Sequence, residues 1–192
     1  MYVLVEGVDA SGKSTLVELL SKFPGVITTK EPGGTQMGKE IRSLILTSQI
    51  PRSKGAELFL FLADRSDHYE QIVKPNRQTQ IVISDRGYVS GISYAMAMGG
   101  VSYDDLARMN HLAIEGHLPE KIIMMKIDQD LLSRRLAGKK HDMVEARGIE
   151  YQMNVQKIME MTVSKSGSDV LFIDSDLSRE DILEAAVKFI GL

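Results

Sequence analysis

The chain has 192 residues, of which 43% are apolar, and this suits one domain with a real hydrophobic core. A formal net charge of −3 argues against a nucleic-acid partner, because proteins that bind DNA or RNA gather excess lysine and arginine on one face. No cysteine is present, which excludes disulfides and thiolate metal sites. We predict a cytoplasmic protein without a membrane partner, since there is no signal-peptide pattern and no apolar run near the ~20 residues that span a bilayer.

Short apolar, β-branched segments alternate with amphipathic ones along the chain, a pattern typical of βαβ units around a parallel sheet. Five strands are predicted, at residues 2–6, 25–29, 80–84, 121–127 and 169–173. Helical periodicity is clearest at residues 15–23, 55–73, 104–116 and 179–192. No repeat or linker divides the chain, so residues 1–192 are predicted to form a single domain.

The first predicted strand runs into EGVDASGKST, residues 6–15, which satisfies the phosphate-loop pattern G-x-x-x-x-G-K-[ST] between a strand and a helix. Its glycines let backbone N–H groups point at phosphate oxygens, and the following helix adds the positive end of its dipole. Lys13 is expected to neutralise the β- and γ-phosphates, and Ser14 to bind Mg²⁺. The residues predicted to surround ATP are Gly7, Val8, Asp9, Ala10, Ser11, Gly12, Lys13, Ser14 and Thr15. GTPases, ATPases and kinases share this loop, so it does not fix the reaction.

The second strand is followed by KEPGGTQMGKEIRSLI, residues 30–45. Its Pro-Gly-Gly sequence predicts a tight turn, and Arg42 on the next helix can reach an anion. An ordinary turn before a surface helix fits the same residues. In the long helix that follows, Phe61 and Arg65 share a face and suit a planar nucleobase, whereas the apolar run LFLFLA equally fits a core position for Phe61.

The third strand ends in IVISDRG, residues 81–87. Asp85 would lie at the carboxyl edge of the sheet, where a carboxylate helps to hold Mg²⁺, and Arg86 beside the transferred phosphoryl group. A solvated ion pair at a strand end is the alternative. The charged stretch at residues 133–148 fits a mobile flap or a solvated connector. The four histidines lack metal-ligand spacing, and no catalytic histidine is expected.

The segments EGVDASGKST, EPGGT, FLADR and SDRGYVSGISYA occur in an order and spacing that resemble the bacterial-type thymidylate kinases, which are nucleoside monophosphate kinases. The likeness covers most of the chain. It implies an α/β fold with a five-stranded parallel sheet, helices on both faces and a short lid at about residues 133–148. It also implies transfer of the γ-phosphoryl group of ATP to dTMP, with Mg²⁺, giving dTDP and ADP for dTTP biosynthesis.

The resemblance also implies roles for single residues. Phe61 would stack on thymine and Arg65 would bond its O4 atom, while Arg42 and Arg86 would hold the dTMP phosphate. Tyr94 would crowd the 2′ position of the sugar.

Ser90 would belong to the same pocket, and Asp9 would approach the 3′-hydroxyl group and the acceptor phosphate. The residues expected to act in catalysis are Lys13, Arg86 and Asp9, and those expected at the metal are Ser14 and Asp85. Glu31-Pro32 resembles a cis-proline turn of the family, and residues 174–177 are candidates for adenine contacts.

Three positions depart from the family pattern. Gly87 stands where relatives usually carry an aromatic residue, and Gly91 where many carry a polar side chain that bonds thymine. Some relatives also have a catalytic arginine at the position of Ala10, and others supply that charge from a D-R-x-E lid, which here reads DMVE at residues 142–145. The candidates to replace the charge are Arg134, Arg135, Lys139, Lys140 and Arg147, with Lys140, Arg135 and Arg147 preferred in that order.

Two further predictions concern assembly and rival functions. The resemblance implies a homodimer, to which the helix around residues 57–61 could contribute. The nearest rival is a P-loop kinase for another nucleotide or a nucleoside. A GTPase-like switch lacks support because no NKxD motif is present, and a nucleotide sensor without catalysis would have lost Lys13 or Arg86, which both remain.

Overall fold

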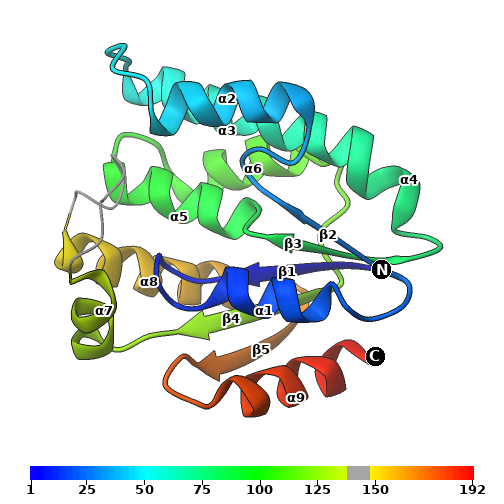
Figure 1. Cartoon of the computed structure of the whole chain (residues 1–192). Coiled ribbons are helices and arrows are strands. Elements are labelled where there is room, and N and C mark those ends of the chain that lie inside the picture. The colour runs from blue at the N-terminus through cyan, green and yellow to red at the C-terminus, as the bar shows by residue number, and fades with distance from the viewer. Residues whose placement is uncertain (138–147) are drawn as a thin grey trace.

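The computed structural model describes residues 1–137 and 148–192. Its centre is a parallel sheet of five strands in the order β2-β3-β1-β4-β5 (Figure 1). The strands are β1 (Tyr2–Glu6), β2 (Val26–Lys30), β3 (Ile81–Asp85), β4 (Lys121–Lys126) and β5 (Asp169–Asp174). Each lies within a residue or so of its predicted position. The central strands β1, β3 and β4 are buried on both faces and so are continuous apolar runs, and the edge strands β2 and β5 are rich in β-branched and apolar residues.

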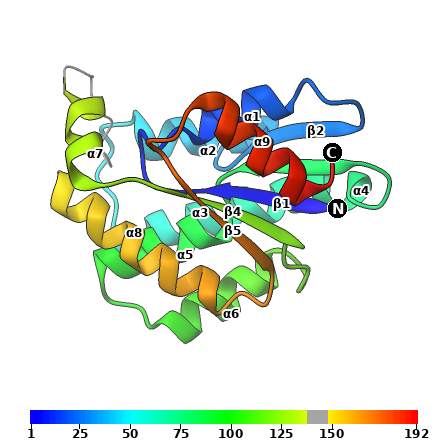
Figure 2. The same cartoon turned by 90° about the horizontal axis from the view of Figure 1, so that it is seen from below.

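Helices connect the strands and cover both faces of the sheet. The helices before β4 are α1 (Lys13–Leu20), α2 (Gln36–Leu46), α3 (Lys54–His68), a π-helical turn η1 (Tyr69–Val73), α4 (Lys74–Asn76), α5 (Tyr88–Met98) and α6 (Tyr103–Ala113). Those after β4 are α7 (Gln129–Leu136), α8 (Ile149–Ser164) and α9 (Arg179–Ile190). In Figure 2, α1 and α9 lie on one side of the sheet, and α5 and α8 on the other.

The two faces of the sheet belong to two separate apolar cores. Along β1, Val3 and Val5 pack with α1 and α9, whereas Leu4 packs with α5 and α8 on the opposite face. This alternation follows from the twofold side-chain period of a strand. Both layers therefore hold β1 rigidly beneath the loop that follows it.

The predicted helix at residues 55–73 does not continue as a regular α-helix. After α3 the backbone widens, and the N–H group of Lys74 donates to the carbonyl of Tyr69, five residues earlier. Pro75 follows at once and has no N–H group for a regular helical bond, so the wider turn lets the chain continue through it.

The segment predicted as a lid is partly helical. Residues 133–136 form the end of α7, and Gly148 is the N-cap of α8. Residues 138–147, with the candidates Lys139, Lys140 and Arg147, lie outside the described part of the chain. Within the described part, no helix has both the length and the apolar character needed to cross a bilayer.

Candidate active site

A cleft of about 1130 Å³ opens at the carboxyl ends of the central strands. Parallel α/β sheets bind ligands at this edge, where the loops after neighbouring strands diverge. The lining comes from the predicted phosphate loop, the turn after β2, the end of β3, α7 and the loop after β5. The sequence-predicted residues Arg42, Asp85, Arg86 and Arg135 all face this cleft.

The phosphate loop wraps around the amine of Lys13. Gly7 adopts φ +148°, and a Cβ atom there would lie 2.6 Å from the carbonyl oxygen of Met125, so only glycine fits between β1 and β4. The amine of Lys13 donates to the carbonyl of Val8 at 2.8 Å. Burial, and then the nearby guanidinium of Arg86, lowers the pKa of Lys13 to about 8. An anion in the loop would restore the preference for the charged amine.

The two predicted metal residues lie together. The Ser14 hydroxyl donates to Oδ2 of Asp85 at 2.6 Å, across the gap between α1 and β3. Hard oxygen donors suit Mg²⁺, which takes only one or two protein ligands and completes its octahedron with water and phosphate oxygens. The described residues hold no group of three or more acidic, histidine or cysteine side chains that could bind a metal, which agrees with so sparse a set. Ser14 and Asp85 therefore fit Mg²⁺.

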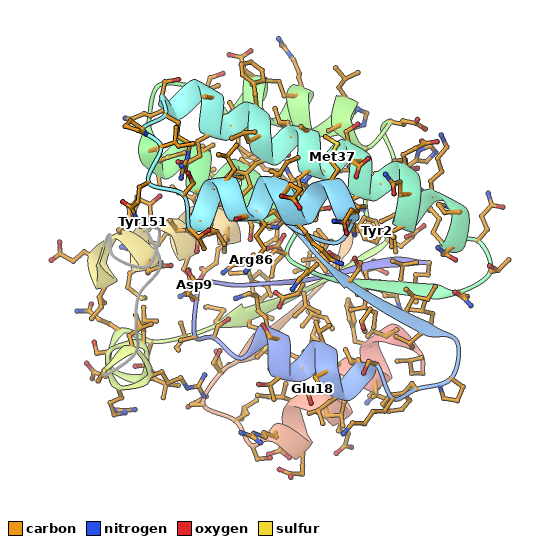
Figure 3. All side chains as sticks on the ribbon, turned by 45° about the horizontal axis from the view of Figure 1, so that its top comes forward. Tyr2, Asp9, Glu18, Met37, Arg86 and Tyr151 are labelled. Atoms are coloured by element: carbon orange, nitrogen blue, oxygen red, sulfur yellow. The ribbon has the colours of Figure 1, made fainter. Side chains whose placement is uncertain are left out.

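Arg86 lies at the centre of the cleft in a strained backbone conformation. Its φ is +71°, in the left-handed region that residues other than glycine rarely adopt. Its guanidinium donates to the carbonyl of Gly7 at 3.0 Å, to the Ser90 hydroxyl at 3.0 Å and to the carboxylate of Asp9. Figure 3 shows Asp9 and Arg86 side by side below α2. Three partners fix the plane of the guanidinium before any substrate enters.

The hydroxyl of Ser90 is used inside the protein. It donates to Oε2 of Glu6 at 2.5 Å while it accepts from Arg86. Glu6 is fully buried at the end of β1, and its burial raises its pKa although the bonds from Ser90 act in the opposite direction. The structure thus places Ser90 in the predicted pocket as a bridge between Glu6 and Arg86. Sequence reasoning missed Glu6, whose only signal is a charged residue inside an apolar strand.

Asp9 accepts hydrogen bonds from three sides. Besides Arg86, the Tyr94 hydroxyl and Nε2 of Gln152 each donate to Oδ2 of Asp9 at 3.2 Å. Burial alone would raise the pKa of Asp9, but Arg86 and Lys13 hold it below its usual value. Asp9 is therefore an anion at neutral pH and an acceptor for hydroxyl groups. Gln152 of α8 was missed, because nothing in the sequence links it to a loop 143 residues earlier.

A second, narrower pocket adjoins the cleft between α2, α3 and α5. Phe61 lines it and is half-buried, which separates it from the apolar core that the sequence left as an alternative. The sequence-predicted residues in its lining are Asp9, Arg42, Phe61, Arg65, Arg86, Ser90 and Tyr94. Arg42 also donates to the carbonyl of Pro32 at 3.0 Å, and the Glu31-Pro32 peptide bond is cis, as the resemblance implies.

The packing around Gly91 and Gly87 explains why neither position carries a side chain. A Cβ atom at Gly91 would lie 2.5 Å from Nη1 of Arg65, so the missing side chain makes room for the guanidinium. Gly87 packs against Leu4, where a Cβ atom would come within 2.8 Å of its methyl carbons. The two departures from the family pattern are thus linked to the packing of Arg65 and β1.

Of the lid candidates, the structure describes Arg134 and Arg135. Arg134 is exposed, whereas Arg135 reaches the phosphate loop. Its guanidinium donates to the carbonyl of Ala10 at 2.9 Å and to that of Ser175 at 2.6 Å. Arg135 therefore places a positive charge beside the position where the sequence lacks one.

The two pockets share Asp9, Glu31, Arg42 and Arg86 at their boundary. A donor phosphate in the loop and an acceptor in the second pocket would meet at these charged groups. This arrangement, on a five-stranded parallel sheet, defines a P-loop kinase of the nucleotide kinase fold.

Comparison with known proteins specifies the family. A family model described as thymidylate kinase matches residues 5–186. The chain is 47% identical to the thymidylate kinase of Sulfurovum sp. over 99% of both chains, and 44% identical to that of Campylobacter concisus over 100% of this chain and 99% of the relative. The chain belongs to the thymidylate kinase family.

A solved structure agrees with this fold. The crystal structure of thymidylate kinase from Ehrlichia chaffeensis matches with a TM-score of 0.79, covering 100% of this chain and 98% of that chain. Its sequence identity of 24% makes this a likeness of fold.

Proposed function

We propose that this kinase transfers the γ-phosphoryl group of ATP to the 5′-phosphate of dTMP, giving ADP and dTDP for dTTP synthesis. Membership of the family supports the reaction. The observation that carries the assignment of the two pockets is their shared boundary at Asp9, Arg42 and Arg86. Phosphoryl transfer depends mainly on positioning and on neutralising the charge of the moving group, and these residues suit both tasks.

The donor would occupy the phosphate loop. Backbone N–H groups and Lys13 would bind its phosphates, with the base toward Leu177, which also lines the cleft. Ser14 and Asp85 would hold Mg²⁺, which when bound supplies positive charge to the phosphate oxygens. Arg135 is the described candidate for further charge at the loop, since it already bonds the carbonyl of Ala10.

The acceptor would occupy the second pocket. Phe61 would stack on the pyrimidine, and Arg65 would face its carbonyl edge. Arg42 and Arg86 would bind the 5′-phosphate, and Asp9 would accept a hydrogen bond from the sugar hydroxyl. The acceptor phosphate is already an anion, so the reaction needs no general base to generate the nucleophile.

We also propose a cytoplasmic homodimer. A chain without cysteine suits a reducing compartment without requiring one. The dimer is supported by exposed apolar side chains that line neither pocket: Phe59 of α3 is 64% exposed and Leu112 of α6 is 80% exposed.

The reaction is tested by measuring ADP release from ATP and Mg²⁺ with dTMP, dUMP, dCMP, AMP and GMP as acceptors. We expect the highest kcat/KM with dTMP. Equal or greater turnover of another acceptor would contradict the substrate assignment and favour a P-loop kinase for a different nucleotide. Lys13→Ala should abolish turnover while the melting temperature stays within a few degrees of the parent value, because the lysine neutralises charge rather than filling the core.

A further inference from the structure

The guanidinium of Arg65 is almost completely held by the protein. Arg65 is 3% exposed, and Nε donates to Oε2 of Glu31 at 2.8 Å. Nη2 donates to the carbonyl of Gly87 at 2.9 Å, and Nη1 donates to Oδ1 of Asn110. A guanidinium has five N–H groups, so one on each terminal nitrogen is left for a ligand.

The carboxylate of Glu31 is in turn held on both oxygens. Oε1 lies 2.8 Å from Nδ1 of His68, whose Nε2 lies 2.8 Å from the Thr29 hydroxyl. Burial would raise the pKa of Glu31, but Arg65 and His68 hold it below its usual value, so the carboxylate is ionised and Nδ1 carries the proton. His68 is fully buried, so of the surface and packing roles expected for the histidines it has the packing role.

Asn110, which lies on α6, holds the remaining terminal nitrogen of Arg65, Nη1. Its Nδ2 donates to the carbonyl of Leu106 at 2.7 Å, which leaves Oδ1 as the atom that faces Arg65. The side chain is 1% exposed. Asn110 lies outside the second pocket, whereas Arg65 lines it, so Asn110 can act on a ligand only through Arg65.

Two sequence motifs meet in this cluster. Besides the contacts of Glu31, the N–H group of Gly33 donates to Asp64 at 2.9 Å, and a Cβ atom at Gly34 would lie 2.6 Å from Cδ2 of His68. The turn after β2 and the end of α3 therefore interlock around Arg65. Their shared geometry explains why EPGGT and ADRSDH contain small and charged residues at these positions.

We propose that Glu31, His68 and Asn110 are positioning residues that fix Arg65 as a reader of the 4-keto oxygen of the acceptor pyrimidine. This inference rests on the proposed function and adds the residues that set its base specificity. A guanidinium only donates, so the exocyclic amino group of cytosine would face another donor and leave both unpaired. An arginine with free rotamers could turn away from that amino group, whereas an arginine fixed on three nitrogens cannot.

The test compares Asn110→Leu with Asn110→Asp and with Gln156→Leu. Asn110→Leu removes the acceptor of Nη1 at similar volume, and Asn110→Asp restores an acceptor. Gln156 is a matched control, since it is a buried amide that makes two bonds to the backbone of Ile127 at 3.0 Å and lines neither pocket. The measured quantity is the ratio of kcat/KM for dTMP to kcat/KM for dCMP.

We expect Asn110→Leu to lower this ratio about 10-fold, mainly by raising KM for dTMP, with KM for ATP within about twofold of the parent value. Asn110→Asp should recover most of the ratio, and Gln156→Leu should leave it unchanged. An unchanged ratio in Asn110→Leu, or an equal loss in Gln156→Leu, would overturn the proposal. Failure of the proposed function is a different result, in which the parent enzyme shows no preference for dTMP.

Variants at His68 provide the second route if Asn110→Leu does not fold. His68→Gln places an amide near the position of Nε2 and leaves Oε1 of Glu31 without its partner, whereas His68→Asn keeps a donor near the position of Nδ1. The glutamine variant should lose discrimination about 10-fold, and the asparagine variant should retain it. Equal ratios in the two variants would contradict the role of the His68–Glu31 contact.

Discussion

The charge of the Lys13 amine depends on whether phosphate groups lie beside it. Without nucleotide its pKa is about 8, lowered by burial and then by Arg86, while bound phosphates would raise it. Binding of ATP should therefore take up a proton above pH 8. We predict that the Kd for ATP rises about tenfold for each pH unit above 8, as titration calorimetry from pH 6.5 to 9.5 would show.

Lys13→Arg serves as the control for this pH dependence. Arginine keeps its charge throughout the range, so its affinity for ATP should not change between pH 7 and 9. If the arginine variant shows the same weakening at alkaline pH, another group is responsible.

Ser90 links Glu6 at the end of β1 with Arg86, which directly follows β3. It donates to Glu6 and accepts from Arg86. Ser90→Ala would therefore remove the hydroxyl donor to Glu6, keep the 3.2 Å bond from the backbone N–H at position 90, and loosen Arg86. We expect kcat to fall about 10-fold in steady-state assays, with KM for ATP unchanged, because the proposed role of Arg86 is to bind the acceptor phosphate. Ser90→Thr keeps the hydroxyl and should recover most of kcat. Full activity of the alanine variant would mean that Gly7 and Asp9 alone position Arg86.

Residues near one another in the chain were predictable, and residues that meet through the fold were not. The phosphate loop places Lys13 and Ser14 by local spacing, so a single motif identifies them. Asn110 and Gln152 reach Arg65 and Asp9 from helices whose packing decides the contact. Their side chains carry no local signal, since a buried amide in a helix is defined by its partner.

At the scale of elements, the strands were predictable because each is a short run rich in apolar and β-branched residues, most clearly in the central strands β1, β3 and β4. The helix α5 was read only as a motif, since YVSGISYAMAM is apolar on most sides and lacks a polar stripe. The turn after β2 was left as either an ordinary turn or a binding feature. Its contacts with Arg65 and Asp64 show that the turn packs against α3 and is not a free surface turn.

The packing of that turn against α3 buries Asp64, which lowers the free energy of unfolding by an amount that depends on pH. Asp64 is 1% exposed, and burial followed by repulsion from Glu31 raises its pKa to about 6. The folded state therefore binds this proton more tightly than the unfolded state, whose pKa is about 4. The free energy of unfolding contributed by Asp64 is greatest below pH 4 and declines as pH rises to 6.

Asp64→Asn should remove this cost while Oδ1 still accepts from Gly33. We predict that the variant gains about 2 kcal/mol in free energy of unfolding at pH 7.5, and less at pH 5, as measured by urea denaturation. Asp130→Asn, the same exchange at an exposed position in the first turn of α7, controls for net charge and should give no gain. An equal gain at both pH values would show that Asp64 is not the titrating group.

At the scale of the molecule, the strand order assembles the site. Because β3 and β1 are neighbours, Asp85 pairs in register with Val5, just before the phosphate loop, and so meets Ser14. The sequence predicted five strands, but their order depends on how the helices pack over the two faces. Local motifs therefore identify the site residues, whereas the strand order determines how these residues are arranged relative to one another.

The helix at residues 57–61 presents its neighbouring side chains to three different environments. Leu58 is 7% exposed and lies in the core, Phe61 lines the second pocket, and Phe59 is 64% exposed. Sequence alone could not separate these roles. Figure 1 shows α2 and α3 together on the side of the molecule away from α9, and Phe59 of α3 lines neither pocket.

This surface carries the prediction of a homodimer. In a twofold interface both subunits contribute the same residue, so Phe59→Glu introduces two charges. The dimer would have to bury both charges, and the monomers would otherwise separate and expose the apolar surface that the dimer covers. We expect Kd for dimerisation to rise at least about 100-fold, and light scattering after size exclusion to give the monomer mass at micromolar concentration. Phe172→Glu is the matched control, because Phe172 is 48% exposed on β5, at one edge of the sheet. Dissociation by both variants would reflect general destabilisation, and a parent enzyme that is already a monomer would refute the dimer itself.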